Sequence, residues 1–286
     1  MKHFVLFILS LMIMGSCGQP AREPLSDQRD AKGTLFIIGG GSRPEAMVQR
    51  MITESGVDRE GYVVILPMSS AEPDSAIIWS GEQFWAQGLE QVTGFNFLPG
   101  ETPNPEWVDS LRQASLIYIS GGDQNRFMNI VRGTAIEAAI HQAYKNGAMI
   151  AGTSAGAAVM SELMITGDEL RYPEYRSTFR TIESENIELA QGLGLMTNAI
   201  IDQHFVWRSR HNRLISAVIE HPELPGIGID ESTAILVKGK QAEVVGVSQV
   251  LVFSNPDQSI QHYETKLGAR NLVLDIYLPG DTFTLP

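Results

Sequence analysis

The amino-acid sequence predicts an α/β fold, a doubly wound and mostly parallel sheet flanked by helices, with extra antiparallel strands near the C-terminus. First, short apolar runs typical of buried strands alternate with stretches of helical character through the first half of the chain. Second, several of these runs end in segments rich in glycine or serine, which suit loops at the carboxyl ends of parallel strands. Third, 286 residues that are 43% apolar and 19% charged are sufficient for one large domain with a full core.

The first half of the chain is expected to contribute five strands and four helices. The strands are mostly apolar and span residues 34–38, 62–67, 92–97, 116–119 and 148–151. The helices between them span residues 46–55, 74–88, 104–114 and 134–146. Within the second helix, the large rings of Trp79, Phe84 and Trp85 are expected to lie in the core.

A run of three glycines, Gly39 to Gly41, follows the first predicted strand. A phosphate cradle is the minority interpretation, because the sequence has neither the GxGxxG spacing nor a P-loop lysine after the run. We expect instead a loop whose backbone can approach a neighbouring active-site loop.

Residues 152–156, Gly-Thr-Ser-Ala-Gly, lie at a predicted strand-to-helix corner and form a G-x-S-x-G pattern. A nucleophile that projects from a sharp turn needs neighbours without bulky side chains, and the backbone there is often strained. The N-terminal amides of the following helix would face the same corner, which suits a developing oxyanion. Ser154 is therefore the candidate nucleophile, and the alternative is that the pattern is only a tight turn.

The regular alternation ends after Ser161. Residues 163–183 carry several charges and aromatic rings and are interpreted as an insertion or lid; they include Arg171, Tyr172, Tyr175 and Arg176. A strand at 198–201 and a helix that contains the next arginines and reaches Glu220 are expected to follow. The remaining strands are expected at residues 226–229, 234–237, 242–247, 249–253 and 271–277. With no internal repeat and no boundary after Gly33, residues 33–286 are expected to form a single domain.

A serine hydroxyl is a poor nucleophile at neutral pH and needs a base within hydrogen-bond reach. His204 is the favoured base, because it ends an apolar strand beside Asp202 and Gln203 and precedes a run of arginines. The alternative is a core histidine with a satisfied hydrogen bond. His211 is the rival base, but its position within the predicted helix favours exposure to solvent.

The base in turn needs an orienting carboxylate. Asp230 and Glu231 follow the strand at 226–229 and are the main candidates, although they could also be a turn or capping pair. Asp202 is close in sequence to His204 and is a less obvious choice. The residues alone leave this assignment open.

An oxyanion needs two donors, of which one is expected to be the backbone N–H of Ala155. The other is expected from Gly121 or Gly122, whose amides can face a pocket because no side chain intervenes. Gln124 would then be placed to hold substrate. At least one of three arginines could clamp a substrate carboxylate, and at least one is expected to lie on a solvated helix face; they are Arg208, Arg210 and Arg213.

Four motifs in one chain are far more specific than the serine pattern alone. They are Gly-Gly-Asp-Gln at 121–124, Gly-Thr-Ser-Ala-Gly-Ala at 152–157, Asp-Gln-His-Phe at 202–205 with the three arginines after it, and Gly-Ile-Asp-Glu-Ser-Thr-Ala at 228–234. Together they resemble the cyanophycinases, which belong to a serine peptidase family that also contains aspartyl dipeptidase. The resemblance covers nearly the whole chain from Gly33 and implies a fold like that of class I glutamine amidotransferases, with serine in place of their cysteine.

The resemblance also implies roles for individual residues. Ser154 would be the nucleophile, His204 the base and Glu231 the charge-relay carboxylate. The positions that match substrate recognition in the family are Gln124, Asp202, Gln203, Arg208, Arg210 and Arg213. Family members are commonly dimers, which implies the same for this chain. No metal or other cofactor is expected.

The leading hypothesis is a serine exopeptidase that hydrolyses cyanophycin, a poly-aspartate backbone with arginine on each β-carboxyl, to β-Asp-Arg dipeptides through an acyl-enzyme on Ser154. One alternative is a dipeptidase for peptides with N-terminal aspartate or β-aspartyl linkages. Another is a non-catalytic binding lipoprotein of the same fold. The net charge of −12 and the absence of a basic run in the sequence argue against nucleic acid as a partner.

The N-terminus has the pattern of a targeting segment. A short basic start precedes the apolar residues 4–14, and small residues lead to Cys17, the single cysteine of the chain. This resembles a lipoprotein signal over residues 1–17, with lipidation of Cys17 and a polar tether over 18–32. The expected localisation is export with lipid anchoring to the bacterial envelope, and Gly18 favours the outer membrane. The alternative is an ordinary secretory peptide, followed by a periplasmic or secreted protein.

Overall fold

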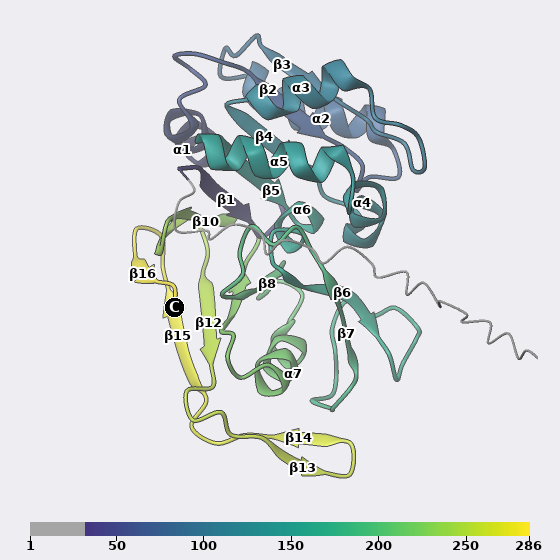
Figure 1. Cartoon of the computed structure of the whole chain (residues 1–286). Helices are drawn as coiled ribbons and strands as arrows, with labels where there is room; N and C mark the ends of the chain where they lie inside the picture. Colours follow the sequence, from purple (N-terminus) through teal and green to yellow (C-terminus); the bar gives the residue numbers. More distant parts are fainter. Residues whose placement is uncertain (1–31) are drawn as a thin grey trace, which may run out of the picture.

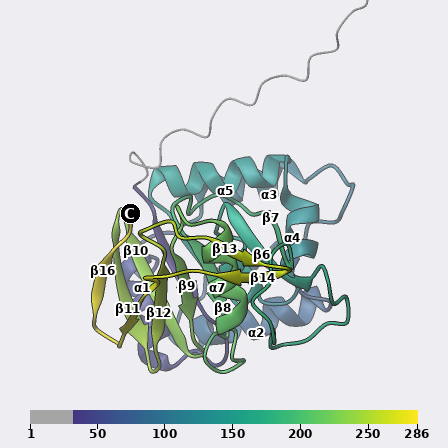
Figure 2. The ribbon, with the colours of Figure 1, turned by 90° about the horizontal axis from the view of Figure 1, so that it is seen from below.

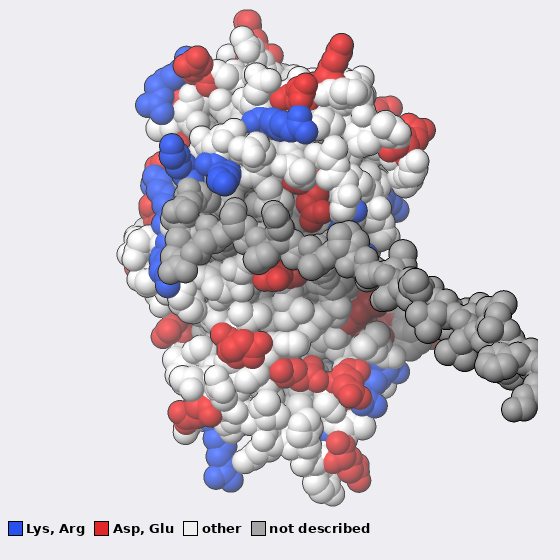
Figure 3. Space-filling model, viewed as in Figure 1, with Lys and Arg blue, Asp and Glu red and all other residues white. Residues whose placement is uncertain are grey.

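The structure, a computed structural model, describes residues 32–286. The predicted signal peptide, the lipidation of Cys17 and all but the last residue of the predicted tether lie outside the described residues. Within the described part, no helix is long and apolar enough to cross a membrane. On the face shown in Figure 3, acidic side chains are scattered over both the upper and the lower part of the molecule.

The centre of the molecule is an eight-stranded sheet in the order β16-β11-β10-β1-β5-β4-β2-β3. Five strands pair in parallel: β1 (Thr34–Ile38), β2 (Val63–Leu66), β3 (Val92–Gly94), β4 (Leu116–Ile119) and β5 (Met149–Thr153). Three antiparallel strands extend the sheet beyond β1: β10 (Thr233–Lys238), β11 (Gln241–Gly246) and β16 (Thr282–Thr284). The predicted fold class is confirmed, including the antiparallel addition from the C-terminal part.

Helices cover both faces of this sheet, because each parallel strand returns through a helical crossover. Side chains alternate along β1, so that Leu35 and Ile37 face one hydrophobic cluster while Phe36 and Ile38 face the other. The first cluster is covered by α3 (Pro105–Gln113), α4 (Gln124–Val131) and α5 (Ala135–Asn146). The second is covered by α1 (Glu45–Ser55) and α2 (Pro73–Trp85), and Figure 2 shows the two sets of helices on opposite sides.

Two expectations for the first half were wrong. Phe84 is fully buried, but Trp79 and Trp85 are 60% and 42% exposed, because α2 has only one side against the sheet. The helix α4 was not predicted, and it begins where the Asp123 side chain accepts hydrogen bonds from the backbone N–H groups of Asn125 and Arg126.

A second sheet has the order β15-β12-β9-β8 and packs against α7 (His211–Glu220). Its strands are β8 (Ile200–Gln203), β9 (Gly226–Ile229), β12 (Val250–Ser254) and β15 (Val273–Tyr277). The predicted helix start was too early, since Arg208 and Arg210 lie in the turn before α7. In Figure 1, β8, β12, β15 and α7 lie below the central strands β1, β4 and β5.

The predicted insertion, residues 163–183, forms β6 (Leu163–Glu169) and most of a long loop, and β6 pairs antiparallel with β7 (Ile187–Gln191), which follows that loop. A hairpin formed by β13 (Gln261–Tyr263) and β14 (Lys266–Gly268) supports that loop. Backbone hydrogen bonds join residues 182 and 184 of the loop to residues 267 and 265 of the hairpin, and Lys266 forms an ion pair with buried Glu183. The C-terminal part of the chain therefore holds the insertion in place (Figure 2).

Candidate active site

Ser154 lies at a sharp corner between β5 and the short helix α6 (Ala155–Ala158). Its φ of 54° and ψ of −111° are strained for a residue with a side chain. A Cβ on Gly152 would lie 2.3 Å from the Gly156 carbonyl oxygen, and a Cβ on Gly156 would lie 2.3 Å from that of Ile119. Both glycines of the motif are therefore required by close backbone contacts, which explains the G-x-S-x-G spacing.

His204 and Glu231 lie beside this serine and form a continuous hydrogen-bonded chain with it. The His204 Nε2 atom is 2.9 Å from Ser154 Oγ, and its Nδ1 atom is 2.5 Å from Glu231 Oε1. His204 follows β8 directly, at a φ of 49°, and Glu231 follows β9. Because β8 and β9 are parallel neighbours, their ends bring the two residues together.

The other two candidate carboxylates are engaged elsewhere. Asp230 accepts hydrogen bonds from the Trp207 backbone N–H and the Ser248 hydroxyl. Asp202 is buried and pairs with Arg213. Of the three carboxylates that the sequence left open, Glu231 is the one that contacts His204.

The glycine run after β1 packs directly on this chain of groups, in agreement with the expectation for that loop. At Gly40, whose φ is +113°, a Cβ would lie 2.3 Å from His204 Cε1 and 2.6 Å from Nε2. At Gly41 a Cβ would lie 2.8 Å from that of Glu231. The backbone of the loop also accepts from His204 N through Gly39 O, at 2.7 Å. The imidazole thus has a fixed position between the loop and the serine.

The surroundings of His204 favour its neutral form. Burial lowers the pKa of His204 below its usual value, and the charges of Arg208 and Arg210 act in the same direction. The hydrogen bond to Glu231 opposes these effects by stabilising the imidazolium. A neutral imidazole that accepts from a serine hydroxyl is suited to act as a base.

The three predicted arginines converge on one cavity but differ in their own partners. Arg213 is fully buried and forms a two-pronged ion pair with Asp202, with Nε 2.7 Å from Oδ2. Arg210 is also buried and donates from Nη1 to the Gln203 carbonyl oxygen at 2.8 Å. Asp202 was expected to meet substrate, but it is 1% exposed and instead orients Arg213.

Replacing Asp202 with asparagine should destabilise the fold by about 3 kcal/mol, because the buried Arg213 guanidinium would lose its counter-charge. Chemical denaturation of wild type and D202N measures this difference. The matched control is D109N, whose ion pair with Arg112 is exposed and should contribute less than about 1 kcal/mol. Equal stability of wild type and D202N would show that the pair is dispensable.

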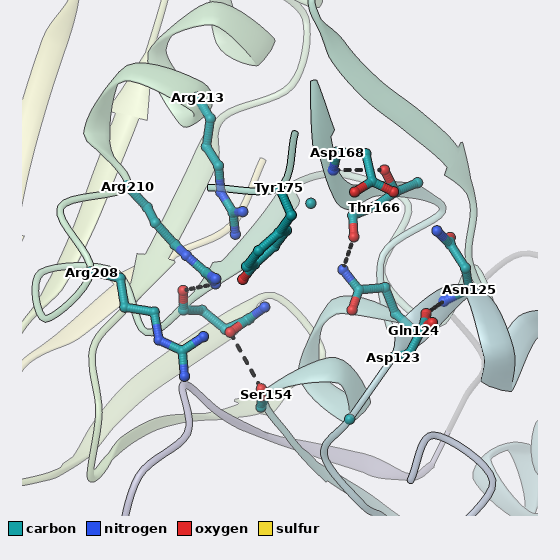
Figure 4. Close-up of a pocket in the computed structure, with 13 residues that line it drawn as sticks. Asp123, Gln124, Asn125, Ser154, Thr166, Asp168, Tyr175, Arg208, Arg210 and Arg213 are labelled. Carbon is teal, nitrogen blue, oxygen red and sulfur yellow. Dashed lines mark hydrogen bonds between the residues drawn. The ribbon is translucent and has the colours of Figure 1, made fainter. Parts of the chain in front are cut away.

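The cavity has a volume of about 290 Å³, and Ser154 is among the residues that line it (Figure 4). Besides Ser154 it is lined by Gly122, Asp123, Gln124, Asn125, Thr166, Gly167, Asp168, Tyr175, Gln203, Arg208, Arg210 and Arg213. Gln203 accepts from the Ser154 hydroxyl at 3.4 Å. Gln124 is buried and its amide nitrogen donates to the backbone of β6, which leaves its oxygen as the group available to a ligand.

Of the predicted oxyanion donors, Gly122 lines the same cavity as Ser154, and Ala155 follows Ser154 directly. Gly122 lines the cavity at a φ of +139°, where a Cβ would collide with the Ser69 carbonyl oxygen at 2.1 Å. The Ala155 N–H is in the first turn of α6, where a helix offers no internal acceptor. Both backbone positions are thus close to the serine corner.

Several lining residues were not predicted individually. Thr166, Gly167, Asp168 and Tyr175 belong to β6 and the loop after it, and Asn125 belongs to the unpredicted helix α4. The only signal in the sequence was that residues 163–183 formed a charged and aromatic insertion. Nothing in that segment resembled a motif that would have placed its side chains opposite the arginines.

Comparison with known proteins gives the family. The profile described as Peptidase family S51 matches residues 35–245. The chain belongs to peptidase family S51. This S51 chain is 35% identical over 269 residues to the cyanophycinase of Nostoc sp. strain PCC 7120, covering 89% of this chain and 86% of that protein. It is 30% identical over 265 residues to the cyanophycinase of Geminocystis herdmanii, covering 88% and 93%.

Two solved structures share the fold of this S51 chain. A peptidase from an acI-B1 Actinobacterium has a TM-score of 0.64 at 22% identity, covering 90% of this chain and 99% of that one. A putative peptidase E protein from Listeria monocytogenes has a TM-score of 0.51 at 15% identity, covering 76% and 99%. The predicted resemblance and the predicted enzyme class, a serine-type peptidase, are confirmed. Its substrate is therefore a peptide or a peptide-like polymer.

Proposed function

We propose that this S51 peptidase hydrolyses cyanophycin to β-Asp-Arg dipeptides. The observation that carries the proposal is the hydrogen-bonded series Ser154, His204 and Glu231, whose serine lines a cavity that three arginines also line. Arginines bind carboxylates with two parallel hydrogen bonds, and cyanophycin offers the α-carboxylate of each arginine branch and the free carboxylate at its C-terminal end. The similarity to cyanophycinases over nearly nine-tenths of the chain supports the same substrate.

In the proposed mechanism, Ser154 Oγ attacks the scissile carbonyl carbon while its proton passes to His204 Nε2. Glu231 accepts the Nδ1–H bond, which fixes the tautomer and stabilises the imidazolium that forms. The backbone N–H groups of Ala155 and Gly122 would stabilise the oxyanion.

Collapse of the tetrahedral intermediate breaks the C–N bond, and His204 gives its proton to the leaving amine. An ester on Ser154 remains. His204 then removes a proton from a water molecule, which attacks the ester carbonyl and releases the acid product with the serine hydroxyl restored.

The acid limb of the pH profile is expected below the ordinary histidine value. Since the base must be neutral, activity is lost as pH falls through the pKa of His204, which burial lowers. We expect the midpoint of kcat/KM, which reports the free enzyme, to lie below pH ~6.5. In E231Q the midpoint should move lower still, because Glu231 raises this pKa. A wild-type midpoint above the ordinary value would contradict this assignment of the base.

Incubating residues 32–286 with purified cyanophycin and identifying released products by mass spectrometry tests the substrate. Release of β-Asp-Arg supports the proposal. A dipeptidase for N-terminal aspartate or β-aspartyl peptides is the second candidate, because the same arginines would hold a single aspartate. In that case Asp-X or β-Asp-X dipeptides would be cleaved and the polymer would stay intact. A third possibility is a non-catalytic binding protein. Labelling of wild type by a fluorophosphonate, with no labelling of S154A, would argue against it.

We also propose that the chain is exported and anchored through lipid on Cys17, with the polar residues 18–32 as a tether. The support is the basic and apolar start of the sequence and the position of its single cysteine. Metabolic labelling with a fatty acid in a bacterial host should mark wild type and not C17A. The dimer that the resemblance implies stays a prediction, and light scattering tests it.

A further inference from the structure

The cavity beside Ser154 has opposite charges on facing walls. Arg208, Arg210 and Arg213 lie on one wall, and Asp123 and Asp168 lie on the other, as Figure 4 shows. The first wall comes from the turn before α7 and from α7 itself. The second comes from the turn before α4 and from β6. A ligand that fills the cavity would therefore meet both charges at once.

The arginine wall is built to hold an anion. Arg210 is 3% exposed, and its Nε atom has no hydrogen-bond partner among residues 32–286. The Arg210 Nη1 atom lies 4.0 Å from Asp202 Oδ1, and that oxygen already accepts from Arg213. Burial and the charge of Arg213 lower the pKa of Arg210 to about 10. Since a buried donor without a partner is costly, an acceptor on a ligand in the cavity would be favourable at the Arg210 Nε atom.

The opposite wall has an unpaired negative charge. Within residues 32–286, the Asp168 carboxylate has no hydrogen bond and no ion pair, and its side chain lies at the cavity. Asp123 caps α4 through its Oδ1 atom, which accepts from the N–H groups of Asn125 and Arg126. Glu188 accepts from the Thr166 hydroxyl at 2.7 Å and lines a neighbouring cavity. The Asp168 side chain is exposed, but partial desolvation and the negative charges of Glu188 and Asp123 raise its pKa, and a cation at this wall would oppose that shift.

We propose that Asp168, with Asp123 beside it, binds the positively charged group of the substrate and sets the preference for a basic side chain. The substrate unit is then one with carboxylates at the arginine wall and a guanidinium at the aspartate wall, as in a β-aspartyl-arginine unit. The inference rests on the proposed function for the identity of that unit. Because the two walls carry opposite charges, the cavity would favour a dipeptide with both a carboxylate and a cationic side chain over one whose side chain is neutral.

The test compares two ligands that differ only in charge: β-Asp-Arg and β-Asp-citrulline, in which a neutral urea replaces the guanidinium. Calorimetric binding to S154A needs no turnover. We expect S154A to bind the arginine dipeptide more tightly, and adding D168N to weaken that binding by about 10- to 100-fold. Binding of the citrulline dipeptide should change by less than about twofold, and D168E should retain the preference.

Two controls separate a direct contact from a general field. E162Q removes an exposed carboxylate at the start of the same insertion, outside the cavity, and should leave both affinities unchanged. E188Q removes the charge next to Asp168 without touching the cavity. A loss in E188Q equal to that in D168N, an equal loss for both dipeptides in D168N, or no loss in D168N would overturn the inference.

The corresponding oligomers, with arginine or citrulline throughout, separate this inference from the proposed function. If wild type cleaves the arginine oligomer, D168N should lower kcat/KM for it through KM and spare the citrulline oligomer. If wild type cleaves neither oligomer but the binding preference holds, the proposed function fails and the role of Asp168 stands. If wild type cleaves the arginine oligomer and D168N leaves this cleavage unchanged, the proposed function stands and the role of Asp168 fails.

Discussion

Replacing Ser154 with alanine is expected to lower the rate of cyanophycin hydrolysis by roughly 10⁴- to 10⁶-fold. The serine oxygen is the only hydroxyl that hydrogen-bonds to His204 among the described residues, so no neighbouring group can form the ester in its place. The Ser154 side chain is small and partly exposed, and the backbone forms the strained corner. Its removal should therefore leave the fold intact. Single-turnover kinetics on the polymer measures the loss.

The matched control is S70A, because Ser70 also follows a strand of the central sheet but only accepts from the Glu72 N–H. That variant should keep wild-type activity. Both variants should unfold at wild-type temperature within a few degrees. Retention of more than about a hundredth of the activity in S154A, with folding intact, would be incompatible with an acyl-enzyme on Ser154.

Replacing Gly40 with alanine is expected to lower kcat by at least about 100-fold, although Gly40 donates no group to catalysis. The added Cβ would overlap the imidazole at 2.3–2.8 Å, so His204 would have to move away from Ser154 and Glu231. A displacement of about 1 Å in a positioned catalytic group is enough for such a loss. Steady-state kinetics should show a large fall in kcat and little change in the binding of the β-Asp-Arg product.

The control for backbone strain alone is G100A. Gly100 also has a positive φ, +75°, but a Cβ there meets nothing within 4 Å. G100A should cost about 1 kcal/mol of stability and none of the activity. If G40A and G100A have the same kcat, the contact between the glycine loop and His204 does not contribute to catalysis.

Much of the fold could be predicted from the sequence because the signal is local. Runs such as 34–38 and 116–119 consist almost entirely of apolar residues, and both match strands residue for residue. The G-x-S-x-G spacing and the residues after β8 and β9 also indicated where polar groups would gather, since parallel strands share an edge for their carboxyl ends. Where burial depends on a neighbour, local patterns failed: Trp79 and Trp85 are apolar yet exposed, because no element covers that side of α2.

The sequence by itself determined the class of fold, the serine corner and the set of polar residues available for chemistry, because each follows from side-chain type and short-range spacing. Only the tertiary structure decided which of these residues meet. In the folded chain, Glu231 rather than Asp230 contacts His204, and Asp202 forms an ion pair with Arg213. Asp168 lies across the cavity from the arginines. The physical reason is that such partners are far apart in the chain or compete for the same group, so their pairing depends on how two sheets pack and not on any local periodicity.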